Sequence, residues 1–143
     1  MALEEPSLAA EVCVESVGDP RGRVVLIAAD EYSIGRMLTG VLSRTGLAVV
    51  WPGGMVEAVD WLRENPGRAA AAFVDCHQTA GEGREFCLRA REATRGLPVY
   101  LAGGRDGLEV IAGLQSAGLT RHVQRPYLPT EVAWLLRDCL FAT

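Results

Sequence analysis

Three charged residues follow stretches of the sequence that are predicted to be strands, and together they could act on a phosphoryl group. Asp30 comes after residues 24–28, Asp75 after residues 70–74, and Arg125 after residues 122–124. Two neighbouring carboxylates repel each other, which raises a pKa or recruits a divalent ion, and oxygen-only ligands suit magnesium. With a guanidinium beside them, the three groups would offer a phosphoryl group both a metal ion and a fixed cation.

The stretches before these residues are typical of buried strands that alternate with helices. Residues 24–28 form a continuous apolar run, which indicates a strand covered on both faces. Apolar residues then recur at helical spacing from Ile34 to Leu42, and Gly46 follows in the position that closes a helix. The same alternation predicts strands at 48–51, 70–74, 99–102 and 122–124, and helices at 55–65, 82–94, 108–117 and from Pro129 onward.

Five strand-helix units predict an α/β fold, a parallel sheet with helices on both faces. In such sheets the functional crevice lies at the carboxyl ends of the strands. Asp30, Asp75 and Arg125 all occupy that edge, so we expect their side chains to converge. In the last helix, the spacing predicts one core-facing stripe, made of Val132, Leu135, Leu136, Cys139 and Leu140.

Composition excludes several other classes of protein. The chain has 143 residues and 49% hydrophobic content, which suits one domain, and its four cysteines form no C-x-x-C pair. We therefore expect a reducing, cytoplasmic location. No basic leader or membrane-length apolar run is present, so no membrane association is expected. Fourteen basic residues, all arginine, are scattered among acids, and the net charge of −4 argues against direct nucleic-acid binding.

Residues 1–22 are interpreted as an N-terminal extension with a short strand around 12–14, and residues 23–143 as the domain.

Four motifs of the chain resemble those of receiver domains in bacterial response regulators. The sequence Ala-Asp-Glu at 29–31 resembles the acidic pair and Glu after their first strand. Asp75 stands where they carry the phosphate-accepting Asp, and Glu-Gly-Arg-Glu at 82–85 matches the far side of the following loop. Leu-Pro-Val-Tyr-Leu-Ala at 97–102 resembles their fourth strand, and Arg-Pro-Tyr at 125–127 their Lys-Pro-Phe.

The resemblance implies a flavodoxin-like, CheY-like doubly wound sheet of five parallel strands in the order 2-1-3-4-5. It also implies a phosphorelay signalling domain rather than an enzyme, with Asp75 accepting phosphate from a histidine kinase or phosphotransfer protein. Weakly bound magnesium would then be held by Asp30, Asp75 and the backbone carbonyl of His77.

Several positions depart from the family pattern. Ala29 replaces one acid of the pair, which predicts weaker metal binding. Gly103 replaces a Thr or Ser whose hydroxyl would bond a phosphoryl oxygen, and Arg125 replaces Lys with a bulkier planar cation. His122 occupies the aromatic switch position. These changes keep open the alternative of a pseudo-receiver that binds partners without phosphorylation.

Other interpretations of these residues concern loops and cofactors. Asp75 could be a solvated loop acid, and Asp30 could cap a helix. Cys76 and His77 could form a redox or metal pair, although an ordinary loop is favoured. The Asp-x-His stretch at 75–77 resembles a cobalamin-binding loop, but its glycine is one residue late and it follows the third strand instead of the first. A flavin-binding loop would need several Ser or Thr residues after the first strand, where this chain has Ala-Asp-Glu at 29–31.

The last helix also carries a second apolar stripe. Trp134 and Phe141 lie seven residues apart, away from the predicted core face. In receivers, helix four, strand five and helix five form the usual partner face, so His122, Trp134 and Phe141 predict partner docking or a homodimer there. The alternative is that the N-terminal extension covers Trp134.

We expect no output domain after Phe141, so the domain acts alone or belongs to a longer protein.

Overall fold

The central strand of the molecule is β2 (Val24–Ala29), in which every residue is buried. The computed structural model describes residues 11–12, 22–77, 80–103 and 120–141. Strand β2 pairs in parallel with β3 (Val49–Gly53) on one side and β4 (Ala69–Asp75) on the other. Strands β5 (Val99–Gly103) and β6 (Thr120–Gln124) continue the parallel sheet beyond β4. The five-stranded order predicted from the sequence is therefore confirmed.

The predicted sheet gains one short strand at its edge. Strand β1 (Glu11–Val12) pairs antiparallel with β3, and the full order is β1-β3-β2-β4-β5-β6. This strand lies within the segment interpreted as an N-terminal extension, so part of that segment covers the outer edge of β3. Residues 13–14 of the predicted strand lie outside the described residues.

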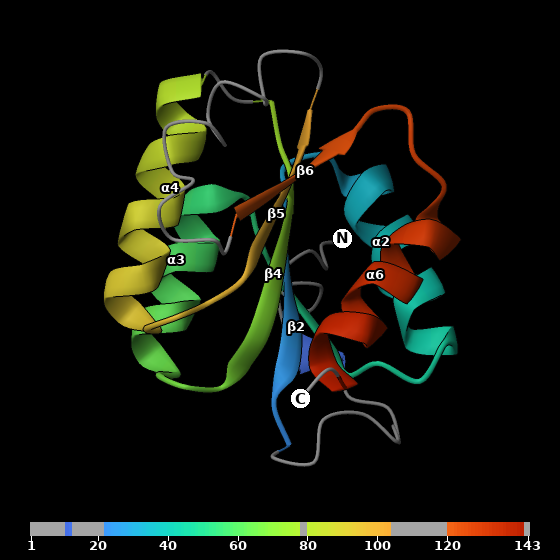
Figure 1. The fold of residues 1–143 in the computed structure, drawn as a ribbon, viewed down its shortest axis with the longest axis horizontal. Helices are drawn as coiled ribbons and strands as arrows, with labels where there is room; N and C mark the ends of the chain where they lie inside the picture. The colour runs from blue at the N-terminus through green and yellow to red at the C-terminus, as the bar shows by residue number, and fades with distance from the viewer. Residues whose placement is uncertain (1–10, 13–21, 78–79, 104–119, 142–143) are drawn as a thin grey trace, which may run out of the picture.

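Helices cover both faces of the sheet, as predicted. Figure 1 shows α2 (Tyr32–Arg44) and α6 (Pro129–Phe141) on one face, and α3 (Met55–Glu64) and α4 (Ala80–Ala93) on the other. Alternate residues of β2 divide between two buried clusters: Val25 and Ile27 pack toward α2 and α6, whereas Leu26 and Ala28 pack toward α3 and α4. This division explains why the β2 sequence is apolar without alternation. The helix predicted at 108–117 lies outside the described residues.

The predicted core face of α6 needs one correction. Val132, Leu136 and Leu140 are buried as predicted, but Leu135 is 41% exposed. Ala133 is buried instead, because the sheet-facing stripe is centred near Leu136, and Leu135 lies about 100° away from that residue around the helix.

A close contact between α2 and β3 fixes the end of β2. The indole Nε1 of Trp51 donates a hydrogen bond to the carbonyl oxygen of Ala29 at 3.1 Å. Its ring lies against Gly35 of α2, where even a Cβ atom would come within 2.1 Å of the indole. The glycine thus allows the ring to support the strand end from which Asp30 projects.

Candidate functional site

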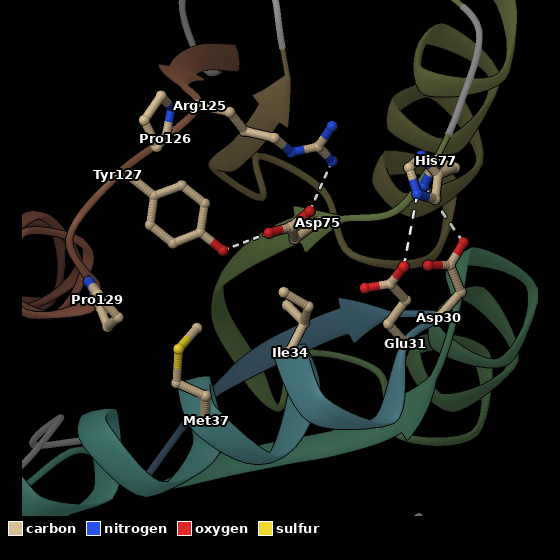
Figure 2. Close-up of a pocket in the computed structure, with 10 residues that line it drawn as sticks. All are labelled: Asp30, Glu31, Ile34, Met37, Asp75, His77, Arg125, Pro126, Tyr127 and Pro129. Atoms are coloured by element: carbon tan, nitrogen blue, oxygen red, sulfur yellow. Dashed lines mark hydrogen bonds and ion pairs between the residues drawn. The ribbon is translucent and has the colours of Figure 1, made fainter.

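The predicted site lies at the carboxyl edge of the sheet. Ala29 and Asp75 are partners in the β2-β4 register, and the amide of Arg125 donates to the Gly103 carbonyl oxygen at 2.9 Å. These pairings bring the ends of β2, β4, β5 and β6 together. A pocket of about 530 Å³ opens there (Figure 2), lined by Asp30, Glu31, Ile34, Met37, Asp75, His77, Arg125, Pro126, Tyr127 and Pro129.

Asp75 is the most buried charged group of this pocket, with only 8% of the residue exposed. Nη2 of Arg125 lies 2.6 Å from its Oδ1 and also donates to the Cys76 carbonyl oxygen at 3.1 Å. The hydroxyl of Tyr127 donates to Oδ2. Both carboxylate oxygens therefore have a partner, and the buried charge is compensated by a charge-assisted hydrogen bond and an ion pair.

The contact of Tyr127 was not predicted from the sequence. Its ring packs edge-on against the buried Phe73, with centroids 5.5 Å apart and an interplanar angle of 82°. Burial, followed by the hydrogen bond to Asp75, raises the pKa of the phenol far above its ordinary value. Tyr127 therefore stays protonated and remains a donor. The signal in the sequence was Tyr in place of Phe in Arg-Pro-Tyr, a change that adds one hydroxyl.

Asp30 lines the same pocket but holds a different partner. Its Oδ2 accepts a hydrogen bond from the backbone amide of His77 at 3.3 Å, which ties the loop after β4 to the end of β2. The alternative role of Asp30 as a helix cap is not what the structure shows, since Glu31 occupies the cap position of α2. The exposed imidazole of His77 lies with Nε2 3.6 Å from Oε2 of Glu31. Figure 2 shows these contacts apart from the Asp75 cluster.

Cys76 is buried, and the charges of both pocket carboxylates, Asp30 and Asp75, act on its thiol. Its thiol donates to the Ala28 carbonyl oxygen at 3.4 Å. Burial, with the charges of Asp30 and Asp75, raises its pKa from 9.0 to about 12. The thiol is therefore neutral and sheltered, which favours the ordinary-loop interpretation over a redox or metal pair.

The atoms that the pocket offers as ligands are of the type that magnesium binds. They are carboxylate and carbonyl oxygens, which are the ligands it prefers. However, in the described ranges no three His, Cys, Asp or Glu side chains gather closely enough to hold a metal ion. Arg125 and Tyr127 already use both oxygens of Asp75, and one oxygen of Asp30 is bonded to the His77 amide. A divalent ion at Asp75 has to compete with these contacts.

Gly103 and His122 lie on neighbouring strands beside the pocket. Among the residues that the structure describes, a Cβ at Gly103 would meet only Nε2 of His122, at 3.9 Å. His122 is half-buried and pairs with Leu101 across β5 and β6. The described residues therefore leave space for a side chain at Gly103, and the hydroxyl of the family pattern is missing because the residue is glycine.

Helix α6 carries the aromatic side chain predicted to lie at the surface. Trp134 is 61% exposed, and the guanidinium of Arg137 lies 5.6 Å from its ring centroid. Nη1 of Arg137 also donates to the Thr45 carbonyl oxygen at 2.7 Å, which links α6 to the end of α2. Phe141 ends the helix, and the placement of its side chain lies outside the description. The docking role of this face stays a prediction.

No protein-family model matches the sequence, and no curated protein matches it either. Solved structures do resemble the chain. A CheY-like receiver domain protein from Methanospirillum hungatei has a TM-score of 0.70 at 19% identity, covering 82% of this chain and 93% of that one. The receiver domain of NtrX from Brucella abortus has a TM-score of 0.66 at 16% identity, covering 83% and 99%. An adenylate cyclase from Rhodopirellula baltica has a TM-score of 0.69 at 20% identity, covering 83% and 87%.

These likenesses confirm the predicted fold, which is that of receiver domains. At these low identities the likenesses show the fold alone. The chemistry of the pocket has to be inferred from its own residues. Within the described residues, no helix has the length and apolar content needed to cross a membrane.

Proposed function

We propose that this chain is a receiver domain of two-component signalling, with Asp75 as its phosphate acceptor. The observation that carries the proposal is the pairing of the buried Asp75 carboxylate with Arg125 at 2.6 Å, at the carboxyl edge of a receiver-type sheet. A buried carboxylate that faces a pocket and is bonded to a fixed cation is a candidate for chemistry and not merely for solvation.

The proposed reaction transfers a phosphoryl group to Asp75 from a phosphohistidine of a kinase or phosphotransfer protein. An oxygen of Asp75 forms a bond to phosphorus while the bond from phosphorus to the donor nitrogen breaks, and the imidazole leaves with that electron pair. Arg125 stays beside the new acyl phosphate and stabilises its negative charge. Magnesium, when bound by Asp30, Asp75 and the His77 carbonyl, would add charge neutralisation.

Unaided phosphorylation is expected to be slow. Ala29 supplies no carboxylate, Gly103 supplies no hydroxyl, and Arg125 spreads its charge over a larger group than lysine does. Phosphoryl transfer depends on positioned positive charge and hydrogen bonds, so losing several such contacts costs orders of magnitude in rate.

The test uses acetyl phosphate and magnesium, with labelling followed by intact mass. Wild type is compared with the triple variant Ala29→Asp, Gly103→Thr and Arg125→Lys, and Asp75→Asn serves as the blank. We expect slow labelling of wild type and faster labelling of the triple variant. Failure of both to be labelled would contradict a phosphate-accepting role for Asp75, and rapid stoichiometric labelling of wild type would contradict the slow reaction.

A second candidate function is a pseudo-receiver that binds partners without phosphorylation. It is favoured by one observation, the engagement of both Asp75 oxygens by Arg125 and Tyr127. On this proposal the fold presents a docking surface. The candidate surface is the α6 face around the exposed Trp134, where a partner or a second copy of the chain would bind. The variant Asp75→Asn distinguishes the two functions. Docking that depends on phosphorylation of Asp75 should change in this variant, whereas docking of a pseudo-receiver should not.

A cytoplasmic location fits either function. Cys76, Cys87 and Cys139 are free thiols among the described residues, as expected of a protein in a reducing compartment.

A further inference from the structure

Tyr127 lies across the carboxylate that the proposed function needs to be reactive. Figure 2 shows its hydroxyl meeting one oxygen of Asp75 while Arg125 meets the other from a different side. A carboxylate that attacks phosphorus has to present a free oxygen, and one that also binds a divalent ion has to present the second. In this structure neither oxygen is free of a donor.

The Tyr127 contact is held in place by packing. The ring lies edge-on to Phe73, a fully buried residue of β4, the same strand that ends in Asp75. The hydroxyl donates to Oδ2 of the Asp75 carboxylate, whose other oxygen is bonded to Arg125. The hydrogen bond to Asp75 is therefore charge-assisted, and such bonds are roughly twice as strong as neutral ones.

We propose that Tyr127 is a latch that withholds Asp75 from magnesium and from phosphodonors. This inference deepens the proposed function and rests on it for its biological meaning. The latch is a positioning device: Tyr127 exchanges no atoms with a substrate but occupies an oxygen that the reaction and the metal both require. Arg125 alone would leave the second oxygen of Asp75 open to the pocket.

The latch also connects the carboxylate to helix α6. Tyr127 precedes Pro129, the first residue of that helix, by two positions. Glu131 anchors the intervening turn, since its amide donates to the Leu128 carbonyl oxygen at 2.9 Å. When another group takes the Asp75 oxygen, the Tyr127 hydroxyl loses its partner at the base of the helix that carries Trp134.

The test measures magnesium binding, which does not depend on phosphorylation. Titration calorimetry with magnesium chloride compares wild type with Tyr127→Phe, which keeps the ring against Phe73 and removes only the hydroxyl. The matched control is Tyr100→Phe, which removes a buried tyrosine hydroxyl on β5 away from the pocket. Circular dichroism establishes that each variant is folded, and Asp75→Asn gives the affinity without the carboxylate.

We expect Tyr127→Phe to bind magnesium about tenfold more tightly than wild type, the change expected from removing one charge-assisted hydrogen bond. Tyr100→Phe should bind as wild type does. Equal affinities in Tyr127→Phe and wild type, or no measurable binding in either, would overturn the latch. If affinity rises but acetyl phosphate still fails to label Asp75 in Tyr127→Phe, the latch toward magnesium stands, whereas its role toward phosphodonors and the phosphate-accepting function fall.

Discussion

Replacing Gly35 with alanine tests how the sheet edge that carries Asp30 is supported. An added Cβ would lie 2.1 Å from the indole of Trp51, whose Nε1 bonds the Ala29 carbonyl at 3.1 Å. The ring is buried, so it has to shift, and the shift pulls its donor away from the end of β2. Gly35→Ala is therefore expected to destabilise the fold although alanine is the better helix former.

The magnitude follows from three opposing contributions. Overpacking a core position costs about 1–3 kcal/mol. Loss of the indole hydrogen bond costs about 1 kcal/mol. Alanine in place of glycine within helix α2 returns about 1 kcal/mol. We expect the free energy of unfolding to fall by about 1–3 kcal/mol.

The matched control is Gly40→Ala on the same helix. There the nearest atom to a new Cβ is Nη1 of Arg44 at 3.4 Å, the far end of a flexible side chain. Urea unfolding followed by far-ultraviolet circular dichroism compares both variants with wild type. Gly40→Ala should stabilise by about 0.5–1 kcal/mol. If Gly35→Ala is as stable as Gly40→Ala, the proposed support of β2 by Trp51 is refuted.

Three further predictions concern the pocket and the α6 face. The thiol of Cys76 should resist iodoacetamide at pH 8 in the native protein, because burial and its acidic neighbours raise its pKa to about 12; peptide mass spectrometry showing alkylation as fast as in urea would contradict this. Trp134→Ala should leave the unfolding free energy within about 0.5 kcal/mol of wild type but reduce self-association or partner binding, and unchanged sedimentation and partner binding would count against the interface. Arg125→Met should destabilise by about 1–3 kcal/mol, because it leaves the Asp75 charge buried with one partner fewer, and adding Asp75→Asn should recover part of that loss in urea unfolding; additive effects would argue against the ion pair.

Much of the fold could be predicted because most strands of the parallel sheet are short apolar runs that alternate with helical repeats. The β2 and β4 sequences are apolar without alternation, which places them at the centre of a parallel sheet, and the structure confirms that position. The edge strand β1 was harder to place, because two residues carry almost no periodic signal. The error at Leu135 arose because a helical stripe read from spacing alone does not tell where the sheet beneath the helix ends.

The site was predicted at the level of strand ends and not of contacts. The order of the strands brings Asp75 and Arg125 to one edge, and their ion pair follows from the shared pocket. Asp30, however, accepts a hydrogen bond from the His77 amide, a backbone contact that the residue types do not reveal. The hydroxyl of Tyr127 reaches Asp75 because its ring rests on Phe73, a packing relation that sequence spacing does not contain.

The most direct test of the account locates the phosphoryl group itself. Tyr127→Phe protein is treated with acetyl phosphate and magnesium, then reduced with borohydride, which converts an aspartyl phosphate to homoserine, and the peptides are sequenced by mass spectrometry. We predict homoserine at position 75, formed faster than in wild type and absent from the double variant Tyr127→Phe, Asp75→Asn. Homoserine at a different aspartate, or none in the described pocket, would contradict the central claim that Asp75 is the phosphate acceptor held closed by its neighbours.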